Sequence, residues 1–271
     1  MTIDEHNNSI GPSAVIDLNA DVGEFFEGEN SSHDEKVIKR ASSVNIACGF
    51  HAGDPQVMQR SVDCAVKNKV AIGALPGLPD LLGMGQQIQK ISPKKAYAQV
   101  LYQVGALQAF AAAAGTRVVH VKPHGALYTM AARDAELARA IATAVADLDS
   151  NLILVGLAGS ELITAGQAVG LPVAREAFAD RAYNKDGSLV SRDNEGAEVE
   201  DVEECVQRSL RMIKEQKVTA ITGEEIEVIA DTLCIDADNP YAVMLLDELR
   251  RAFHKESIDI NSLSEIVSVS K

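Results

Sequence analysis

Short apolar runs alternate with longer amphipathic stretches along most of this 271-residue chain. The runs are continuously apolar rather than alternating, which is typical of strands covered on both faces. Seven are predicted strands, at residues 15–18, 44–48, 70–74, 118–122, 152–157, 173–178 and 232–235. Strands separated by helices in this way predict a parallel sheet with right-handed crossovers.

Capping residues mark the helices between these strands. Asp54 followed by Pro55 predicts a helix that runs to about residue 68, and Ser92 followed by Pro93 predicts a long helix that ends at Gly115. Further helices are expected at 134–148, 160–169, 201–216 and 239–254, with a hairpin at 218–228. Polar motifs end strands along most of the chain, which favours a distorted seven-stranded (β/α) barrel over an open, doubly wound sheet.

Composition and charge exclude several classes of function. A net charge of −14 argues against a nucleic-acid groove and against attraction to anionic lipid. No apolar stretch is long enough to span a membrane, and residues 1–12 lack a signal-peptide core. The four cysteines form no CxxC pair, as expected of reduced thiols in a cytoplasmic protein. Residues 1–13 are expected to be disordered and 14–271 to form a single domain.

Asp17, Asn19 and Asp21 form the first polar motif, at the end of the first strand. Their spacing of two places all three side chains on one face of a strand. Two carboxylates and an amide at a barrel mouth suit general acid–base catalysis or metal binding. The alternative is that Asp21 caps a turn and Asn19 fastens a loop.

His51 follows the second strand and is flanked by glycines. Gly53 permits close approach of the backbone, and the amides of the helix that begins after Asp54 are expected donors to a substrate oxyanion. A glycine-flanked turn is not typical of a core histidine. His51 is therefore a candidate catalytic residue and Gly53 a candidate substrate-binding residue, whereas Asp54 is expected to act as a helix cap.

His120, Lys122 and His124 form the sharpest motif. A buried lysine beside histidines is costly unless a carboxylate or an anion lies next to it, so Lys122 is expected to stabilise an oxyanion. Pro123 ends strand pairing and lets His124 turn inward. If a divalent metal binds, Asp17, His120 and His124 are its expected ligands, although histidines four apart are only a moderate signal.

Two long connections, 76–91 and 179–200, are expected to act as lids or substrate contacts. The arginines of the second loop are suited to binding a carboxylate or a phosphate of a substrate. Ion pairs within the loop are an equally good explanation for their presence. The candidate substrate-binding residues here are Asp180, Arg181, Tyr183 and Arg192, which follow Glu176 at the end of a strand. Neither a GxSxG motif nor a glycine-rich phosphate loop is present.

These segments together resemble the LamB/YcsF family, the A subunit of bacterial-type 5-oxoprolinase. The likeness is carried by the runs DLNADVGE (17–24), NIACGFHAGDP (45–55), YQVGAL (102–107), HVKPHGALY (120–128), EAFADRAY (176–183) and GSLVSR (187–192). The resemblance implies a seven-stranded barrel like those of glycoside hydrolases and polysaccharide deacetylases. It also implies opening of the lactam of 5-oxo-L-proline, with ATP consumed through the B and C partner subunits. The family's polar strand ends match Asp17, Asn19, Asp21, His51, His120, Lys122 and His124.

The chain departs from the family pattern at three loop ends. Leu75 stands where the family has histidine, Gln86 and Gln87 where it has arginines, and Asp236 where it has another histidine. These changes predict weaker binding of anionic intermediates, and Asp236 is expected to repel one. They suggest a diverged member that acts on a less anionic lactam or amide, or one with weakened oxoprolinase activity.

Two other interpretations remain open. In the first, the chain is a metal-dependent deacylase or amidase. In the second, it is a non-catalytic binding or scaffold protein. Whether it forms a homo-oligomer is open in all three.

Overall fold

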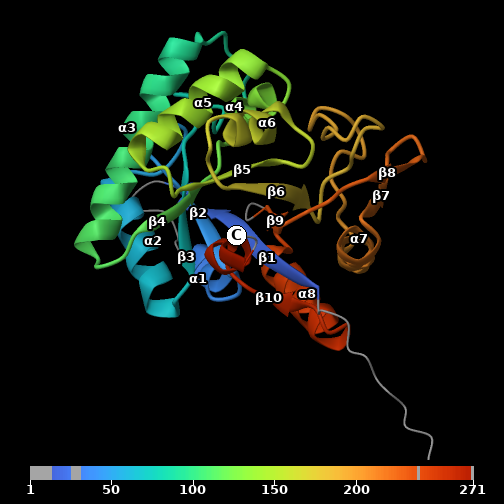
Figure 1. Ribbon diagram of the computed structural model, residues 1–271. Coiled ribbons are helices and arrows are strands. Elements are labelled where there is room, and N and C mark those ends of the chain that lie inside the picture. Colours follow the sequence, from blue (N-terminus) through green and yellow to red (C-terminus); the bar gives the residue numbers. More distant parts are fainter. Residues whose placement is uncertain (1–13, 26–31, 237–238, 270–271) are drawn as a thin grey trace, which may run out of the picture.

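Seven parallel strands form a closed barrel in the computed structural model, which describes residues 14–25, 32–236 and 239–269 (Figure 1). Neighbouring strands follow chain order from β1 to β6, β9 pairs with β6, and a pairing of β1 with β9 closes the ring. The predicted seven-stranded barrel is thus confirmed. Its strands are β1 (Val15–Val22), β2 (Ser43–Ala47), β3 (Ala71–Leu75), β4 (Val118–Val121), β5 (Ile153–Leu157), β6 (Val173–Phe178) and β9 (Thr232–Ile235).

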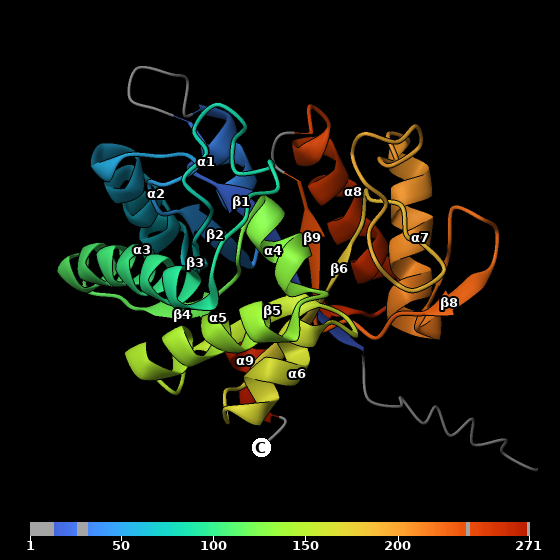
Figure 2. The same cartoon turned by 90° about the horizontal axis from the view of Figure 1, so that it is seen from above.

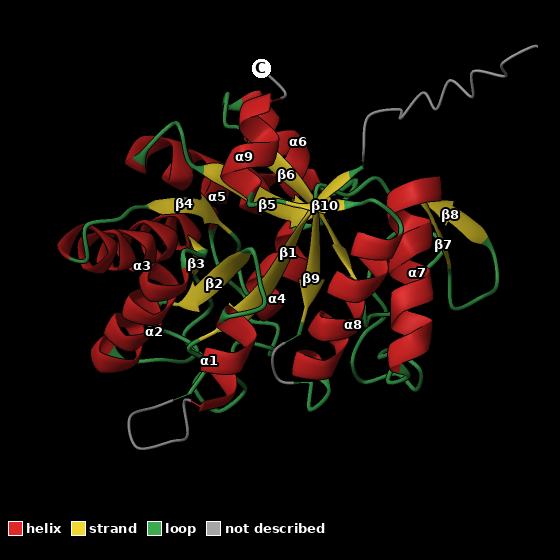
Figure 3. Cartoon of the chain, turned by 90° about the horizontal axis from the view of Figure 1, so that it is seen from below, coloured by secondary structure: helices red, strands yellow, loops and turns green. Residues whose placement is uncertain are grey.

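Helices surround the barrel on its outside, as the views from above and below show (Figures 2 and 3). The predicted caps form: Asp54 accepts hydrogen bonds from the backbone of Gln56 and Val57, and Ser92 accepts one from Lys95. The helices are α1 (Ser32–Ile38), α2 (Pro55–Asn68), α3 (Pro93–Ala113), α4 (Gly125–Ala131), α5 (Ala135–Leu148), α6 (Glu161–Ala168), α7 (Val202–Glu215), α8 (Ala242–Lys255) and α9 (Leu263–Val269).

Several short elements had no clear signal in the sequence. The helices α1, α4 and α9 have seven residues each, too few for a 3.6-residue periodicity to stand out. The strand β10 (Asp259–Ile260) pairs with the first residues of β1. The predicted hairpin is confirmed as β7 (Lys217–Thr219) and β8 (Glu225–Glu227). The expectation of disorder in residues 1–13 lies outside the described residues.

The strands bury apolar side chains outward and polar ones inward. In β1, Leu18 and Ala20 are completely buried in the apolar core, while Asp17 and Asn19 are completely buried among polar partners. Alternation along a strand sends these two sets to opposite faces of the sheet. The interior of the barrel is therefore a polar column whose members need one another as hydrogen-bond partners.

No helix within the described ranges combines the length and the apolar character needed to cross a bilayer.

Candidate active site

Asp17 lies deep in the interior, and three hydroxyl groups surround its carboxylate. Ser42 and Ser43 donate to Oδ1 at 2.7 and 2.5 Å, and Thr232 donates to Oδ2 at 2.5 Å. Burial nevertheless raises the pKa of Asp17 to about 6, because water no longer solvates the charge. Asp17 does not line the pocket that opens above Lys122, but its hydrogen bond from Thr232 supports the layer of polar side chains between them.

Asparagine and histidine side chains form that next layer. Asn19 donates to Thr232 at 2.7 Å and accepts from Asn45 at 2.8 Å. Asn45 in turn donates to Asp21, and its oxygen lies 2.7 Å from Nε2 of His120. That oxygen is an acceptor, so His120 carries its proton on Nε2. Burial lowers the pKa of His120 to about 3, and its ring is therefore neutral.

Lys122 joins this column to the pocket. Its Nζ lies 3.0 Å from Asp21 Oδ1, 3.0 Å from Glu176 Oε1 and 3.1 Å from Cys234 Sγ. Burial disfavours the charged ammonium, but Asp21, Cys234 and Glu176 together raise the pKa of Lys122 well above its ordinary value. The prediction that a carboxylate lies beside this buried lysine is confirmed. The ammonium has three protons and already has these three close partners, so the predicted direct contact with an oxyanion would have to replace one of them.

A pocket of about 160 Å³ opens above Lys122. Both long loops that the sequence marked as substrate contacts contribute to its wall. Tyr128 and Phe178 form an apolar side of the pocket. The remaining lining includes Asp21, Glu24, His124, Met84, Gln86, Arg181, Leu189, Arg192, Cys234 and Asp236.

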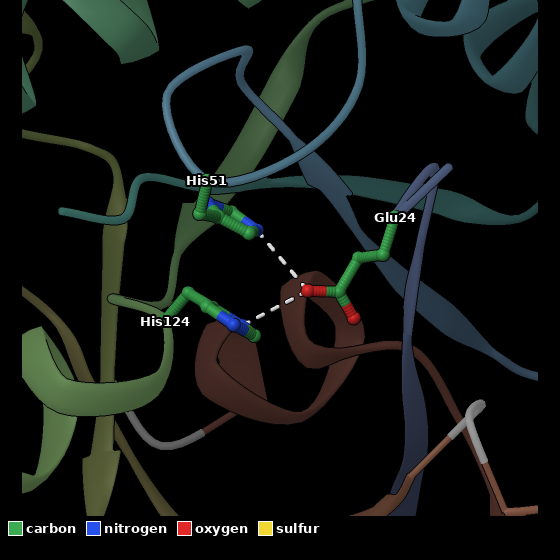
Figure 4. A group of neighbouring side chains, drawn as sticks. All are labelled: Glu24, His51 and His124. Atoms are coloured by element: carbon green, nitrogen blue, oxygen red, sulfur yellow. Dashed lines mark hydrogen bonds and ion pairs between the residues drawn. The ribbon is translucent and has the colours of Figure 1, made fainter. Parts of the chain in front are cut away.

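Glu24, His51 and His124 converge at one side of this pocket (Figure 4). Glu24 Oε1 lies 3.1 Å from His51 Nε2 and 3.2 Å from His124 Nδ1. The two imidazole rings are nearly parallel, with centroids 4.0 Å apart and planes 8° apart. His124 Nε2 lies 2.9 Å from the carbonyl oxygen of Met84 and so carries a proton.

The three groups differ sharply in their affinity for a proton. Burial, and then His124, lower the pKa of His51 to about 2. Burial would also lower that of His124, but Glu24 and Asp21 raise the pKa of His124 to about 9. Burial raises the pKa of Glu24 to about 7. The cluster therefore holds one charged ring, one neutral ring and a carboxyl group that exchanges its proton near neutral pH.

Asp21 approaches the same nitrogen of His124 as Glu24 does, with Oδ2 3.9 Å from Nδ1. Burial alone would raise the pKa of Asp21, but Lys122 and His124 hold it well below its ordinary value. Asp21 is thus a permanent carboxylate that stabilises both cations.

Glu24, His51 and His124 are also the residues that could hold a metal ion. Their ligand atoms lie within 4.8 Å of one another, and two imidazoles with a carboxylate are a set that zinc binds in proteins. A nitrogen lone pair lies in the plane of its ring, however, and two parallel rings 4.0 Å apart cannot both direct lone pairs at one ion. The residues do not fit a metal as they are placed. Asp17, His120 and His124, the ligands expected from the sequence, form no such group among the described residues.

The predicted oxyanion donors at the start of α2 are wrong. The side chain of Asp54 already accepts from the backbone of Gln56 and Val57, and its carbonyl oxygen accepts from Met58. Gly53 is buried, and a Cβ atom there would lie 3.0 Å from the carbonyl oxygen of Gly23, so its absence permits close backbone packing. The Asp54 cap was predicted and is confirmed.

The loop 179–200 is held mainly by its own contacts. Arg181 donates to the carbonyl oxygens of Val190 and Ala197, and the hydroxyl of Tyr183 accepts from the backbone of Phe178. Arg192 forms ion pairs with Asp236 and Glu198. Asp236, expected to repel an anion, is thus neutralised by an arginine. Asp180 lies in an adjoining pocket and accepts from Asn239 at 3.3 Å.

The predicted site residues therefore separate into groups. Five of them line the pocket: Asp21, Lys122, His124, Arg181 and Arg192. His51 contacts the pocket residue Glu24. The remaining six support or flank the pocket: Asp17, Asn19, Gly53, His120, Asp180 and Tyr183.

Comparison with known proteins shows the family of this chain. The sequence profile of the LamB/YcsF family matches residues 16–268. The chain belongs to the LamB/YcsF family. It is 50% identical to the A subunit of a 5-oxoprolinase from Alkaliphilus metalliredigens, over 93% of this chain and 98% of that protein. A counterpart from Pyrococcus abyssi is 46% identical over 93% of this chain and 99% of its own length.

Solved structures show the same fold. A lactam utilization protein from Thermus thermophilus superposes with a TM-score of 0.86 and 44% identity, covering 92% of this chain and all of that one. The catalytic domain of a peptidoglycan N-acetylglucosamine deacetylase from Eubacterium rectale has a TM-score of 0.51 at 8% identity, covering 95% and 92% of the two chains. The deacetylase-like barrel expected of the LamB/YcsF family is therefore confirmed.

The sequence alone did not identify Glu24 and Tyr128 as members of this candidate site. Glu24 lies two residues beyond the end of β1, where spacing by two no longer applies. Tyr128 lies on α4, which the sequence did not predict. Both fall inside runs that carried the family resemblance, which was the only signal for them.

Proposed function

We propose that this chain is the lactam-opening component of a 5-oxoprolinase, converting 5-oxo-L-proline or a related small lactam to the open amino acid. The observation that carries the proposal is the contact of one Glu24 oxygen with both His51 and His124, at the wall of a small pocket. The similarity to proteins named as 5-oxoprolinase A subunits over more than 90% of the chain supports it.

Glu24 and His124 supply the two proton transfers that lactam hydrolysis needs. Glu24, with a pKa of about 7, takes a proton from water as that water attacks the ring carbonyl. His124, charged at neutral pH, donates its Nδ1 proton to the ring nitrogen as the carbon–nitrogen bond breaks. This step converts one lactam and one water to one amino acid, after which Glu24 returns a proton to His124. The coupled hydrolysis of ATP to ADP and phosphate consumes a second water and is assigned to the partner subunits.

The surrounding groups hold this pair in its working state. Asp21 keeps His124 charged, and Lys122 keeps Asp21 ionised. The Tyr128 hydroxyl lies next to the Glu176 carboxyl group and is proposed to donate to the developing oxyanion. Tyr128 lines the pocket, and burial raises its pKa well above the ordinary value, so its O–H keeps its proton.

ATP is proposed to act through partner subunits of the B and C type. Of the Lys and Arg side chains at this pocket, Lys122 and Arg192 are paired with carboxylates and Arg181 donates to two backbone carbonyl oxygens, which leaves few free donors for a triphosphate. A five-membered lactam is unstrained and stabilised by resonance, so coupling its opening to ATP makes chemical sense.

The test is turnover by the purified chain mixed with its B- and C-type partners. Mass spectrometry would follow 5-oxoproline and a set of small lactams, with and without ATP, and with and without a chelator that removes zinc but leaves the magnesium that ATP requires. We expect ring opening that requires ATP and the partners and survives chelation. Loss of all turnover on chelation would favour the metal-dependent amidase, and no ring opening of any lactam would overturn the proposal.

A further inference from the structure

Gln103 is a polar side chain buried completely on the inner face of α3. Its neighbours on that face, Val100, Val104 and Leu107, are apolar and equally buried. Burying an amide among apolar groups is costly unless each of its polar atoms finds a partner. The partners of Gln103 therefore indicate why it is there.

Its amide binds both backbone polar groups of a single residue, Gly77. Oε1 accepts from the Gly77 nitrogen at 3.0 Å, and Nε2 donates to the Gly77 carbonyl oxygen at 3.0 Å. Nε2 also donates to the carbonyl oxygen of Gln99 at 3.1 Å. This two-point contact fixes the position and the orientation of Gly77, just beyond the end of β3.

Gly77 lies directly against the ring of His51. A Cβ atom at Gly77 would be 2.3 Å from His51 Nδ1 and 2.8 Å from Cγ. On the other side, a Cβ at Gly85 would be 2.8 Å from His51 Cβ and 2.9 Å from His124 Cδ2. The backbone of the loop 76–91 thus encloses the stacked rings, and the position of Gly77 sets how far His51 extends toward Glu24.

We propose that Gln103 is a positioning residue for the acid–base cluster, acting through Gly77 to hold His51 against Glu24 and His124. The inference rests on the proposed function and explains a residue in the run 102–107 that the pocket itself does not use. Gln103 does not line the pocket, so it acts on the geometry of the cluster rather than on substrate.

The test replaces Gln103 with methionine, which has a similar length and no hydrogen-bonding amide. Gln108→Met, on the same helix and half-buried, is the matched control. In the complex with its partners, Gln103→Met is expected to lower kcat by about tenfold or more with KM within about twofold, because small displacements of a catalytic group are costly. Histidine NMR signals of the isolated chain are expected to move for both His51 and His124, and Gln108→Met is expected to change neither readout.

A second variant separates positioning from simple packing. Gln103→Glu, held neutral by burial, accepts from the Gly77 nitrogen and donates to one carbonyl oxygen in place of two, so it is expected to fall between wild type and Gln103→Met in both readouts. It also carries the test if Gln103→Met fails to fold. Histidine signals identical to wild type in the folded variants would overturn the proposal even if turnover fell. The NMR readout needs no substrate, so a failure of the proposed lactam chemistry would be recognised separately.

Discussion

The imidazole rings of His51 and His124 stack face to face, with centroids 4.0 Å apart and an angle of 8° between their planes. Two positive rings at that distance would repel strongly in a buried site. Glu24 contacts a nitrogen of each ring, but within the described residues Asp21 forms an ion pair with His124 and none with His51. The proton is therefore held by His124, and His51 stays neutral.

NMR of the histidine side chains as the pH is varied tests whether His124 is charged and His51 neutral. The pKa of His124 is raised to about 9 and that of His51 is lowered to about 2. We expect the His124 signals to show a charged ring at pH 7 and those of His51 a neutral one throughout the folded range. Glu24→Gln should lower the pKa of His124, because it removes the first of the carboxylates that raise it. A His51 ring that titrates near pH 6.5 would contradict the assignment.

Lys122→Met should destabilise the fold by about 3–5 kcal/mol, because Asp21 and Glu176 would be left buried without their cation. Urea unfolding measures the change, with Lys95→Met on the exposed start of α3 as control. Adding Glu176→Gln to Lys122→Met should cost less than the sum of the single changes, since one buried charge is removed. Strict additivity would mean that the two side chains are not coupled.

Gly73→Ala should be costly and Gly105→Ala beneficial. A Cβ at Gly73 would lie 2.0 Å from His120 Nε2, so the ring and its bond to Asn45 must shift, at about 1–3 kcal/mol or more. Gly105 lies within α3 with open space around it, and alanine there should add about 0.5–1 kcal/mol of stability. Thermal unfolding of the two variants compares them, and equal effects would show that the fit around His120 is loose.

Asp17 should make the protein less stable as pH rises from about 4 to 6. Its pKa of about 6 in the folded state exceeds the ordinary 3.8, so in this window the folded state binds more protons than the unfolded state. Stability then falls with rising pH, by about 3 kcal/mol at most for this group. Unfolding of Asp17→Asn should lack that contribution, whereas Asp63→Asn, on the exposed face of α2, should keep it. A wild-type and Asp17→Asn difference that is constant with pH would contradict the raised pKa.

The strands and the barrel could be predicted because both faces of each strand are buried, which leaves continuous apolar runs in the sequence. Placing Asp21, Lys122 and His124 at the pocket follows from the same rule, since the carboxyl ends of parallel strands meet at one mouth.

Depth along a strand could not be predicted in the same way. Asp17 and Asp21 share a face of β1, but four residues at about 3.3 Å each place them roughly 13 Å apart. Asp17 consequently supports the site from below while Asp21 lines it. Glu24 was missed for a different reason. Beyond Gly23 the chain has left the strand, so the direction of the Glu24 side chain depends on packing and not on strand alternation.

The most direct test of the account compares Glu24→Gln with Glu161→Gln, an exposed change at the start of α6, in the complex with partner subunits. The quantity to measure is the rate of 5-oxoproline opening at saturating ATP and substrate. The account predicts a loss of about 10²–10⁴-fold in kcat for Glu24→Gln, with unchanged binding to the partners and a wild-type rate for Glu161→Gln. A Glu24→Gln complex that opens the lactam at the wild-type rate would contradict it.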